Sequence, residues 1–228
     1  MQNNKNISEF ITDAIIGLSD GLTVPFALAA GLSGALLDNN LILTAGIAEV
    51  VAGSIAMGLG GYLSGKTEQE FYTNEYQKLH DENTIENESK TKQAMQWFDT
   101  LGIDEAGKKI LAKQVDFKSE RWVEFFIKMN VGIEKPHPNR ARNAALTIGF
   151  AYFAGGLLPL SAYMMTSKPN VGLLYSLCIT TLCLLMFGYV KSKITGQNPI
   201  LGAIYMAVIG LLAAAAAYAV AKAALLWL

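Results

Sequence analysis

Long apolar stretches alternate with short polar turns along most of the chain, and one long polar segment interrupts them. A membrane-spanning helix needs roughly 20 consecutive, mostly apolar residues. Five stretches reach about this length: residues 11–37, 41–64, 144–165, 171–190 and 200–221. The polar turns lie at 38–40, 166–170 and 191–199. The pattern therefore predicts an all-α integral membrane protein with five transmembrane helices.

The polar segment lies between the second and third apolar stretches. Of the chain's 18 basic and 19 acidic residues, 27 fall between Lys66 and Arg142. Few of its residues favour strands, and its later apolar residues recur at helical spacing. We expect three helices: one continuing from the second span towards a C-cap at Gly102, one near 104–113 and one near 119–131. The segment is thus predicted to be a three-helix insert.

The distribution of basic residues predicts the orientation, because cytoplasmic loops are enriched in Lys and Arg. With the N-terminus in the cytosol, Lys5, Lys191, Lys193 and the insert's basic residues are all cytosolic. Lys168 and Lys222 fall on the opposite side, where five spans also place the C-terminus. The predicted parts are residues 1–65 with transmembrane helices one and two, a cytosolic helical domain over 66–142, and residues 143–228 with helices three to five.

Overall charge and cysteine content exclude some partners. The formal net charge of −1 argues against nucleic-acid binding. Cys178 and Cys183 lie in an apolar stretch without metal-ligand spacing, and two cysteines are too few for a disulfide framework. We expect both to be free, buried thiols.

Two carboxylates and one thioether stand out in the first two apolar stretches. Asp20 lies midway along the first, and Glu49 and Met57 share an i, i+4 ridge with Gly53 in the second. A carboxylate in hydrocarbon is costly, so an intramembrane acid predicts a functional site. Glu49 is nearer a helix end, where snorkelling or a structural hydrogen bond is an alternative, and a single methionine commonly serves packing. Carboxylate with thioether favours a transition metal over Mg²⁺ or Ca²⁺, and a carboxylate can exchange metal for a proton.

A ridge of small residues runs beside these positions on the second stretch. Such ridges let membrane helices approach closely, so we expect a helix interface here. The ridge consists of Ala48, Ala52, Ala56 and Gly60.

Known intramembrane enzyme chemistry does not fit the sequence. An aspartyl protease needs two facing aspartates, whereas only Asp20 lies deep in a span. A serine-type protease needs a histidine base, whereas His80 and His137 both lie in the insert. We therefore expect a protein that is not an enzyme and has no tightly bound cofactor.

Four stretches resemble the vacuolar iron transporter family: "SDGLTVPFALAAGLSGA", "LTAGIAEVVAGSIAMGLGGYLS", "GIEKPHPNRA" and "ALTIGFAYFAGGLLPL". The resemblance covers about residues 11–160. It implies a five-helix homodimer with a permeation path at the dimer interface. It also implies proton-coupled movement of Fe²⁺, and often Mn²⁺, out of the cytosol. The family's transport aspartate and methionine correspond to Asp20 and Met57, and its glutamate in "AGIAEV" to Glu49.

The insert departs from the pattern that the resemblance implies. Plant members hold metal with glutamates on the first insert helix and with methionines and a glutamate on the third. The corresponding residues here are Leu79, Glu82, Lys90, Gln93, Phe126, Ile127 and Asn130. Only Glu82 keeps its type, so we expect the domain to persist with a largely degenerate metal cluster.

Acidic residues still form one stripe on the predicted first insert helix: Glu68, Glu75, Glu82 and Glu86. The stripe could attract cations at low affinity, with Glu75, Glu82 and Glu86 as weak ligands. The alternative is an ordinary solvated helix face.

Three functions remain open at this point. The first is a dimeric exporter that moves Fe²⁺, with Mn²⁺ as a second substrate, by proton exchange. In it, Asp20 binds the ion and Met57 selects it. The second is a non-transporting membrane scaffold or regulatory relative of the same family. The third is a transporter of the same architecture that moves another substrate. The expected location is the inner (plasma) membrane of a prokaryotic cell or the vacuolar membrane of a eukaryotic cell.

Overall fold

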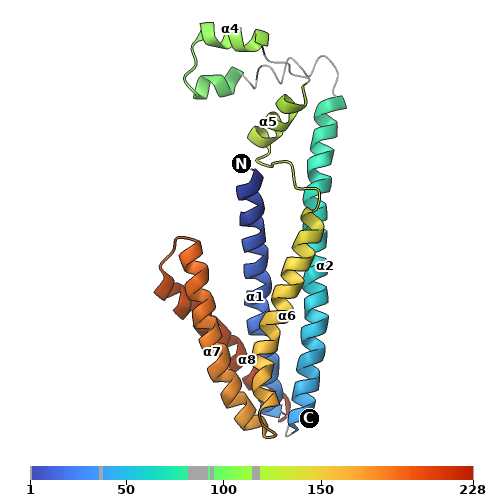
Figure 1. The fold of residues 1–228 in the computed structure, drawn as a ribbon, viewed down its shortest axis with the longest axis vertical. Coiled ribbons are helices and arrows are strands. Elements are labelled where there is room, and N and C mark those ends of the chain that lie inside the picture. Colours follow the sequence, from blue (N-terminus) through green and yellow to red (C-terminus); the bar gives the residue numbers. More distant parts are fainter. Residues whose placement is uncertain (1, 36–37, 82–91, 93–94, 115–118, 228) are drawn as a thin grey trace. The chain divides into compact units, whose positions relative to one another are not determined.

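The computed structural model describes residues 2–35, 38–81, 92, 95–114 and 119–227, and every regular element among these residues is helical. Seven helices have defined bounds (Figure 1): α1 (Gln2–Ala35), α2 (Asn39–Asp81), α4 (Glu105–Gln114), α5 (Glu120–Asn130), α6 (Arg140–Met164), α7 (Pro169–Ile194) and α8 (Pro199–Ala224). The all-helical prediction is therefore confirmed.

Five helices in the described part of the chain are long and apolar enough to cross a membrane. They are α1, α2, α6, α7 and α8, with mean hydropathies between 1.5 and 2.3 over their most apolar windows. Proline begins α7 and α8 at positions where its missing N–H would be unpaired anyway. The order of the spans across the bilayer, and the side on which each turn lies, stay predictions.

Helix contacts divide the chain into two compact units. One unit comprises Met1–Gly65 with Ala141–Leu228 and holds the apolar helices; we call it the membrane unit. The other comprises Lys66–Arg140; we call it the insert. The long helix α2 contributes residues to both.

The membrane unit has a core built around α1. One cluster joins α1, α2 and α6 through residues that include Ala29, Val50 and Leu160, all fully buried. On another side, Phe26 and Ala30 of α1 pack with residues of α7 and α8. These contacts bring α1, α2 and α6 together, and this group holds the intramembrane carboxylates.

The insert is built around one face of α5. Ser119 caps this helix by accepting a hydrogen bond from the Trp122 backbone N–H. Trp122 and Phe126 pack with Trp97 and Phe98 of the helical residues 95–100. Burying large aromatic side chains is a major source of stability in a small unit.

The second and third insert helices agree with the prediction, whereas residues 82–91, 93 and 94 of the first one, expected to continue to Gly102, lie outside the described residues. The helix expected near 119–131 begins at Glu120 and ends at Asn130. The helix expected near 104–113 is α4. The second span continues as one helix to Asp81, the last residue described before a gap. Gly102 has a φ of 75°, the left-handed conformation that suits the end of a helix.

A candidate cation site in the membrane helices

A tyrosine–carboxylate pair lies between α2 and α6. The Tyr152 hydroxyl donates a short hydrogen bond to Oε1 of Glu49. Tyr152 is 3% exposed and Glu49 is half-buried. The prediction left snorkelling or a structural hydrogen bond open for Glu49, and the structure shows a hydrogen bond to a neighbouring helix.

A glycine makes room for this pair. A Cβ at Gly53 would lie 2.6 Å from Cε1, Cζ and Oη of Tyr152, closer than any real contact. Gly53 follows Glu49 by one helical turn, so the two residues lie on the same side of α2. The Tyr152 ring therefore lies against the bare backbone at Gly53 and reaches the carboxylate one turn away.

Glycines also bring α1 against α6 beside Asp20. A Cβ at Gly21 would lie 2.3 Å from the Tyr152 carbonyl oxygen, and one at Gly17 would lie 2.3 Å from that of Ile148. The two backbones are in direct contact at both levels. Asp20, between these glycines on α1, is half-buried. Tyr152 thus contacts Glu49 with its side chain and the turn that carries Asp20 with its backbone.

The oxygen atoms of these two carboxylates are incompletely satisfied. Oε2 of Glu49 is buried and has no hydrogen-bond partner among the described residues. No described side chain hydrogen-bonds to, or forms an ion pair with, the Asp20 carboxylate. A buried carboxylate oxygen without a partner is costly, and the cost falls when a proton or a cation binds to it. The arrangement therefore favours binding of a proton or a cation.

Met57 lies one helical turn beyond Gly53 on α2 and is half-buried. At 1.5 Å per residue it lies about 12 Å from Glu49 along the helix axis. Within the described residues, no hydrogen bond or ion pair joins Asp20 to Glu49, and no group of three or more His, Cys, Asp or Glu side chains could hold a metal. Asp20 therefore lies on α1, and Glu49 and Met57 lie about two turns apart on α2, so the three predicted residues do not form one closed ligand set.

Sequence analysis missed Tyr152. Tyrosine is amphipathic, and a single one in an apolar helix is easily attributed to the membrane interface. The available signal was its position near the middle of the third span, where a buried hydroxyl needs a partner.

Comparison with known proteins assigns the chain to a family. The sequence model described as "VIT family" matches residues 11–222. The chain belongs to the VIT family. Three relatives illustrate the similarity. "Vacuolar iron transporter 1" of Tulipa gesneriana is 44% identical over 95% of this chain and 87% of its own length. "Vacuolar iron transporter 1" of Arabidopsis thaliana is 42% identical over 94% and 86%. "Protein CCC1" of Saccharomyces cerevisiae is 38% identical over 91% and 67%.

The insert of this VIT-family chain has apolar side chains at three of the positions that correspond to metal ligands in plant members: Leu79, Phe126 and Ile127. Phe126 is 6% exposed, Ile127 is fully buried, and Asn130 of the same helix is exposed. Leu79 packs against the two hydrophobic clusters that contain Phe126 and Ile127. These contacts stabilise the unit by burial of apolar surface and provide no metal ligand.

The acidic side chains of the insert that the structure describes are largely paired with basic ones. Glu75 forms a 2.7 Å ion pair with Lys78. Glu68 accepts a hydrogen bond from Nε of Arg140 at 3.2 Å. Glu82, Glu86, Lys90 and Gln93 lie outside the described residues. Paired carboxylates attract cations less strongly than free ones, so the described part of the stripe is closer to an ordinary helix face.

Ion pairs also connect the loop after α5 to the helix itself. Lys135 donates hydrogen bonds to Glu124 at 2.8 Å and to Glu120 at 3.2 Å. These hydrogen bonds raise the pKa of the Lys135 ammonium above its usual range, and the bond to Glu124 has the larger effect. The lysine therefore stays charged at any physiological pH, and its ion pairs connect the loop after α5 to that helix.

Proposed function

We propose that this chain is a divalent transition-metal transporter that exports Fe²⁺ from the cytosol in exchange for protons, with Mn²⁺ as a second substrate. Membership of a family whose relatives carry the name vacuolar iron transporter supports iron as the substrate. The observation that carries the proposal is the Glu49–Tyr152 pair beside Asp20, because its buried, unpartnered carboxylate oxygen favours binding of a positive species.

The proposed roles follow from the chemistry of each group. Asp20 supplies a hard, negatively charged oxygen to the cation, and Met57 supplies a softer thioether that favours Fe²⁺ over Mg²⁺ or Ca²⁺. Glu49 carries the exchanged proton. When Glu49 is ionised, the Tyr152 hydroxyl stabilises the charge by donating to Oε1. When it is protonated, the carboxyl group is neutral and its burial costs much less.

The proposal includes a homodimer with the path at the subunit interface. The ridge of small residues supports this arrangement, because Ala48, Ala52, Ala56 and Gly60 are all exposed in the single chain. A Cβ at Gly60 would have no atom within 4 Å. A face of small residues left uncovered on a membrane helix suits close packing against a second helix. In the proposed topology, the N-terminus and the insert are cytosolic.

The test is uptake of Fe²⁺ into proteoliposomes that carry a pH gradient, with Asp20→Asn as the matched variant. We expect the wild-type protein to take up Fe²⁺ and to release protons from the lumen, so that the lumenal pH rises as Fe²⁺ enters. We expect Asp20→Asn to abolish uptake while the protein remains folded. Full uptake by that variant would remove Asp20 from the mechanism.

The insert makes the scaffold alternative testable in the same assay. Its apolar core at Phe126 and Ile127 is the observation that favours a unit without metal-dependent function. Lys90→Glu places an acid at one of the positions that correspond to metal ligands in plant members of the family. Inactive wild-type protein together with active Lys90→Glu would favour a non-transporting relative, whereas active wild-type protein would show that a metal cluster in the insert is dispensable.

A further inference from the structure

Three polar side chains are buried together at one end of the membrane unit. Ser33 of α1, Asn39 of α2 and Tyr163 of α6 are 7%, 6% and 1% exposed. We call these three residues the polar node. Polar groups are costly at such burial unless they are hydrogen-bonded, so their bonds fix the helices that carry them.

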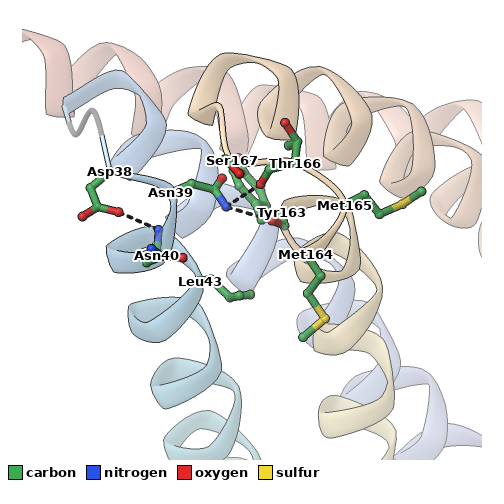
Figure 2. A pocket seen from close by; sticks show the side chains of 9 residues that line it. All are labelled: Asp38, Asn39, Asn40, Leu43, Tyr163, Met164, Met165, Thr166 and Ser167. Carbon is green, nitrogen blue, oxygen red and sulfur yellow. Dashed lines mark hydrogen bonds between the residues drawn. The ribbon is translucent and has the colours of Figure 1, made fainter.

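Asn39 ties the start of α2 to the end of α6. Its Nδ2 donates to the backbone carbonyl oxygens of Tyr163 and Thr166, each at 2.8 Å. Figure 2 shows the Asn39 side chain extending from α2 to these two carbonyls. Carbonyls at the end of a helix lack partners within the helix, and one amide satisfies two here. Both bonds need an N–H donor, so the amide orientation is determined.

Tyr163 extends the node to α1. Its Oη lies 2.8 Å from the Ser33 hydroxyl and donates to the Ala29 carbonyl at 3.3 Å. Ser33 itself donates to the Ala29 carbonyl at 2.7 Å. The node therefore links α1, α2 and α6, the three helices that carry Asp20, Glu49 and Tyr152.

Residue spacing from the node to the candidate site is nearly equal on each helix. On α2, ten residues separate Asn39 from Glu49, or about 15 Å along the axis. On antiparallel α6, eleven residues separate Tyr163 from Tyr152, or about 16.5 Å. On α1, twelve residues separate Ser33 from Gly21, or about 18 Å. Fixing the three helices at the node therefore brings these residues to about the same level.

Outside the node, α2 packs against α6 through close contacts at glycines. Contacts between α2 and α6 run through glycines: Gly46 meets Leu160, Gly53 meets Tyr152 and Gly58 meets Ala145. Within the membrane unit, the described hydrogen bonds between α2 and α6, with the turn that follows it, are those of Asn39 and that of the Glu49–Tyr152 pair. A shift of one residue moves a helix by about 1.5 Å and turns its side chains by about 100°. Such a shift would separate Tyr152 from Glu49.

We propose that Asn39, with Tyr163 and Ser33, is a positioning group that sets the register at which Glu49, Tyr152 and the Asp20 turn meet. Its effect on metal movement rests on the proposed transport function, whereas its effect on the Glu49–Tyr152 hydrogen bond does not. The node acts through helix position, since none of its side chains bonds directly to Glu49 or Tyr152.

The neighbouring residue supplies a matched control. Asn39 and Asn40 both line a cavity of about 560 Å³ at this end of the unit, together with Asp38 (Figure 2). Asn40 is exposed, whereas Asn39 is buried. Asn39→Asp removes both N–H donors and places a carboxylate against two carbonyls. Asn40→Asp introduces the same charge one residue away without breaking a described bond to α6.

The first readout is the infrared C–O stretch of the Tyr152 side chain, assigned by subtracting the spectrum of Tyr152→Phe. We expect this band to shift towards a weaker hydrogen bond in Asn39→Asp and to stay in place in Asn40→Asp. The second readout is Fe²⁺ uptake, which we expect to fall about tenfold or more in Asn39→Asp and to stay within about twofold in Asn40→Asp. Asn39→Ser, which keeps one donor, should give an intermediate result and carries the test if Asn39→Asp does not fold.

The outcomes separate this inference from the proposed function. An unchanged Tyr152 band in folded Asn39→Asp and Asn39→Ser would overturn the positioning role, whatever the uptake. A shifted band in a protein that moves no Fe²⁺ in its wild-type form would uphold the positioning role and contradict the transport proposal.

Discussion

Glycine is the residue that brings the candidate site together. Gly53 admits the Tyr152 ring, and Gly21 admits the Tyr152 backbone, each at a distance where any Cβ would collide. Both glycines are helical, so their value here is the absence of a side chain, since helical dihedral angles suit any residue. A glycine in a helix costs about 1 kcal/mol relative to alanine, and this cost is offset by the contacts that it permits.

Gly53→Ala should therefore displace Tyr152 from Glu49. The new methyl group would meet Cζ and Oη of Tyr152 at 2.6 Å, and overpacking of this kind costs about 1–3 kcal/mol. We expect a lower melting temperature in detergent and slower Fe²⁺ uptake. Gly60→Ala on the same helix is the control, because its methyl group would meet no atom within 4 Å and keeps the exposed ridge small. Equal behaviour of the two variants would show that the Tyr152 contact is unimportant.

Tyr152→Phe should impair transport while preserving the fold. The ring would still lie against Gly53, but Glu49 would lose the hydroxyl that donates to Oε1. Hydrogen bonds to charged groups contribute about 1.5–3 kcal/mol, so we expect uptake to slow about ten- to a hundredfold. Tyr189→Phe on α7 is the matched control, because Tyr189 is 45% exposed and has no described hydrogen bond. A Tyr152→Phe protein with wild-type uptake and pH dependence would exclude Tyr152 from proton exchange.

Helices were the features that the sequence predicted best. Hydropathy over 20-residue windows depends on composition alone, so the five apolar helices follow from it directly. The start of α5 was also predictable, because Ser119 is a good N-cap residue before an apolar repeat. Each of these features is local in sequence.

Contacts between helices were harder to predict for a physical reason. Asp20 and Glu49 could be chosen because an acid in an apolar helix is conspicuous in any fold. Tyr152 and Asn39 could not, because their importance depends on which helix faces them and at what register. Tyrosine and asparagine are also common near membrane interfaces and at helix starts, so neither is conspicuous alone.

The insert helices should keep their fold without metal. Trp122 packs against Trp97 and Phe126, with ring centroids 6.4 and 6.3 Å apart. Such contacts depend on burial of aromatic surface, so chelation with EDTA should leave the near-ultraviolet circular dichroism of the full-length protein unchanged. Trp122→Ala should remove much of this signal and, as a large-to-small core change, cost about 3–5 kcal/mol. Loss of the wild-type signal on adding EDTA would instead indicate a metal that organises the insert.

In the single chain, the membrane unit leaves one face of α2 uncovered. Val51, Ile55 and Leu59 are 44–59% exposed there, next to the small residues of the ridge. Lipid can cover apolar side chains, but a ridge of alanine and glycine gains more from a second helix, because the backbones can approach closely. The proposed homodimer assigns this face to the partner subunit.

Ala52→Leu should therefore weaken the dimer. Leucine is as apolar as its surroundings, so insertion into the membrane is preserved, but its side chain holds a facing helix away from α2. We expect the mass in detergent, measured by light scattering, to fall from two chains towards one, with uptake falling in parallel. Ala216→Leu on α8 is the control, because Ala216 is also exposed but lies away from the ridge. If Ala52→Leu remains dimeric while Ala216→Leu dissociates, the interface lies on α8. If both remain dimeric with wild-type uptake, the small ridge of α2 faces lipid, and the proposed path at an α2 interface is contradicted.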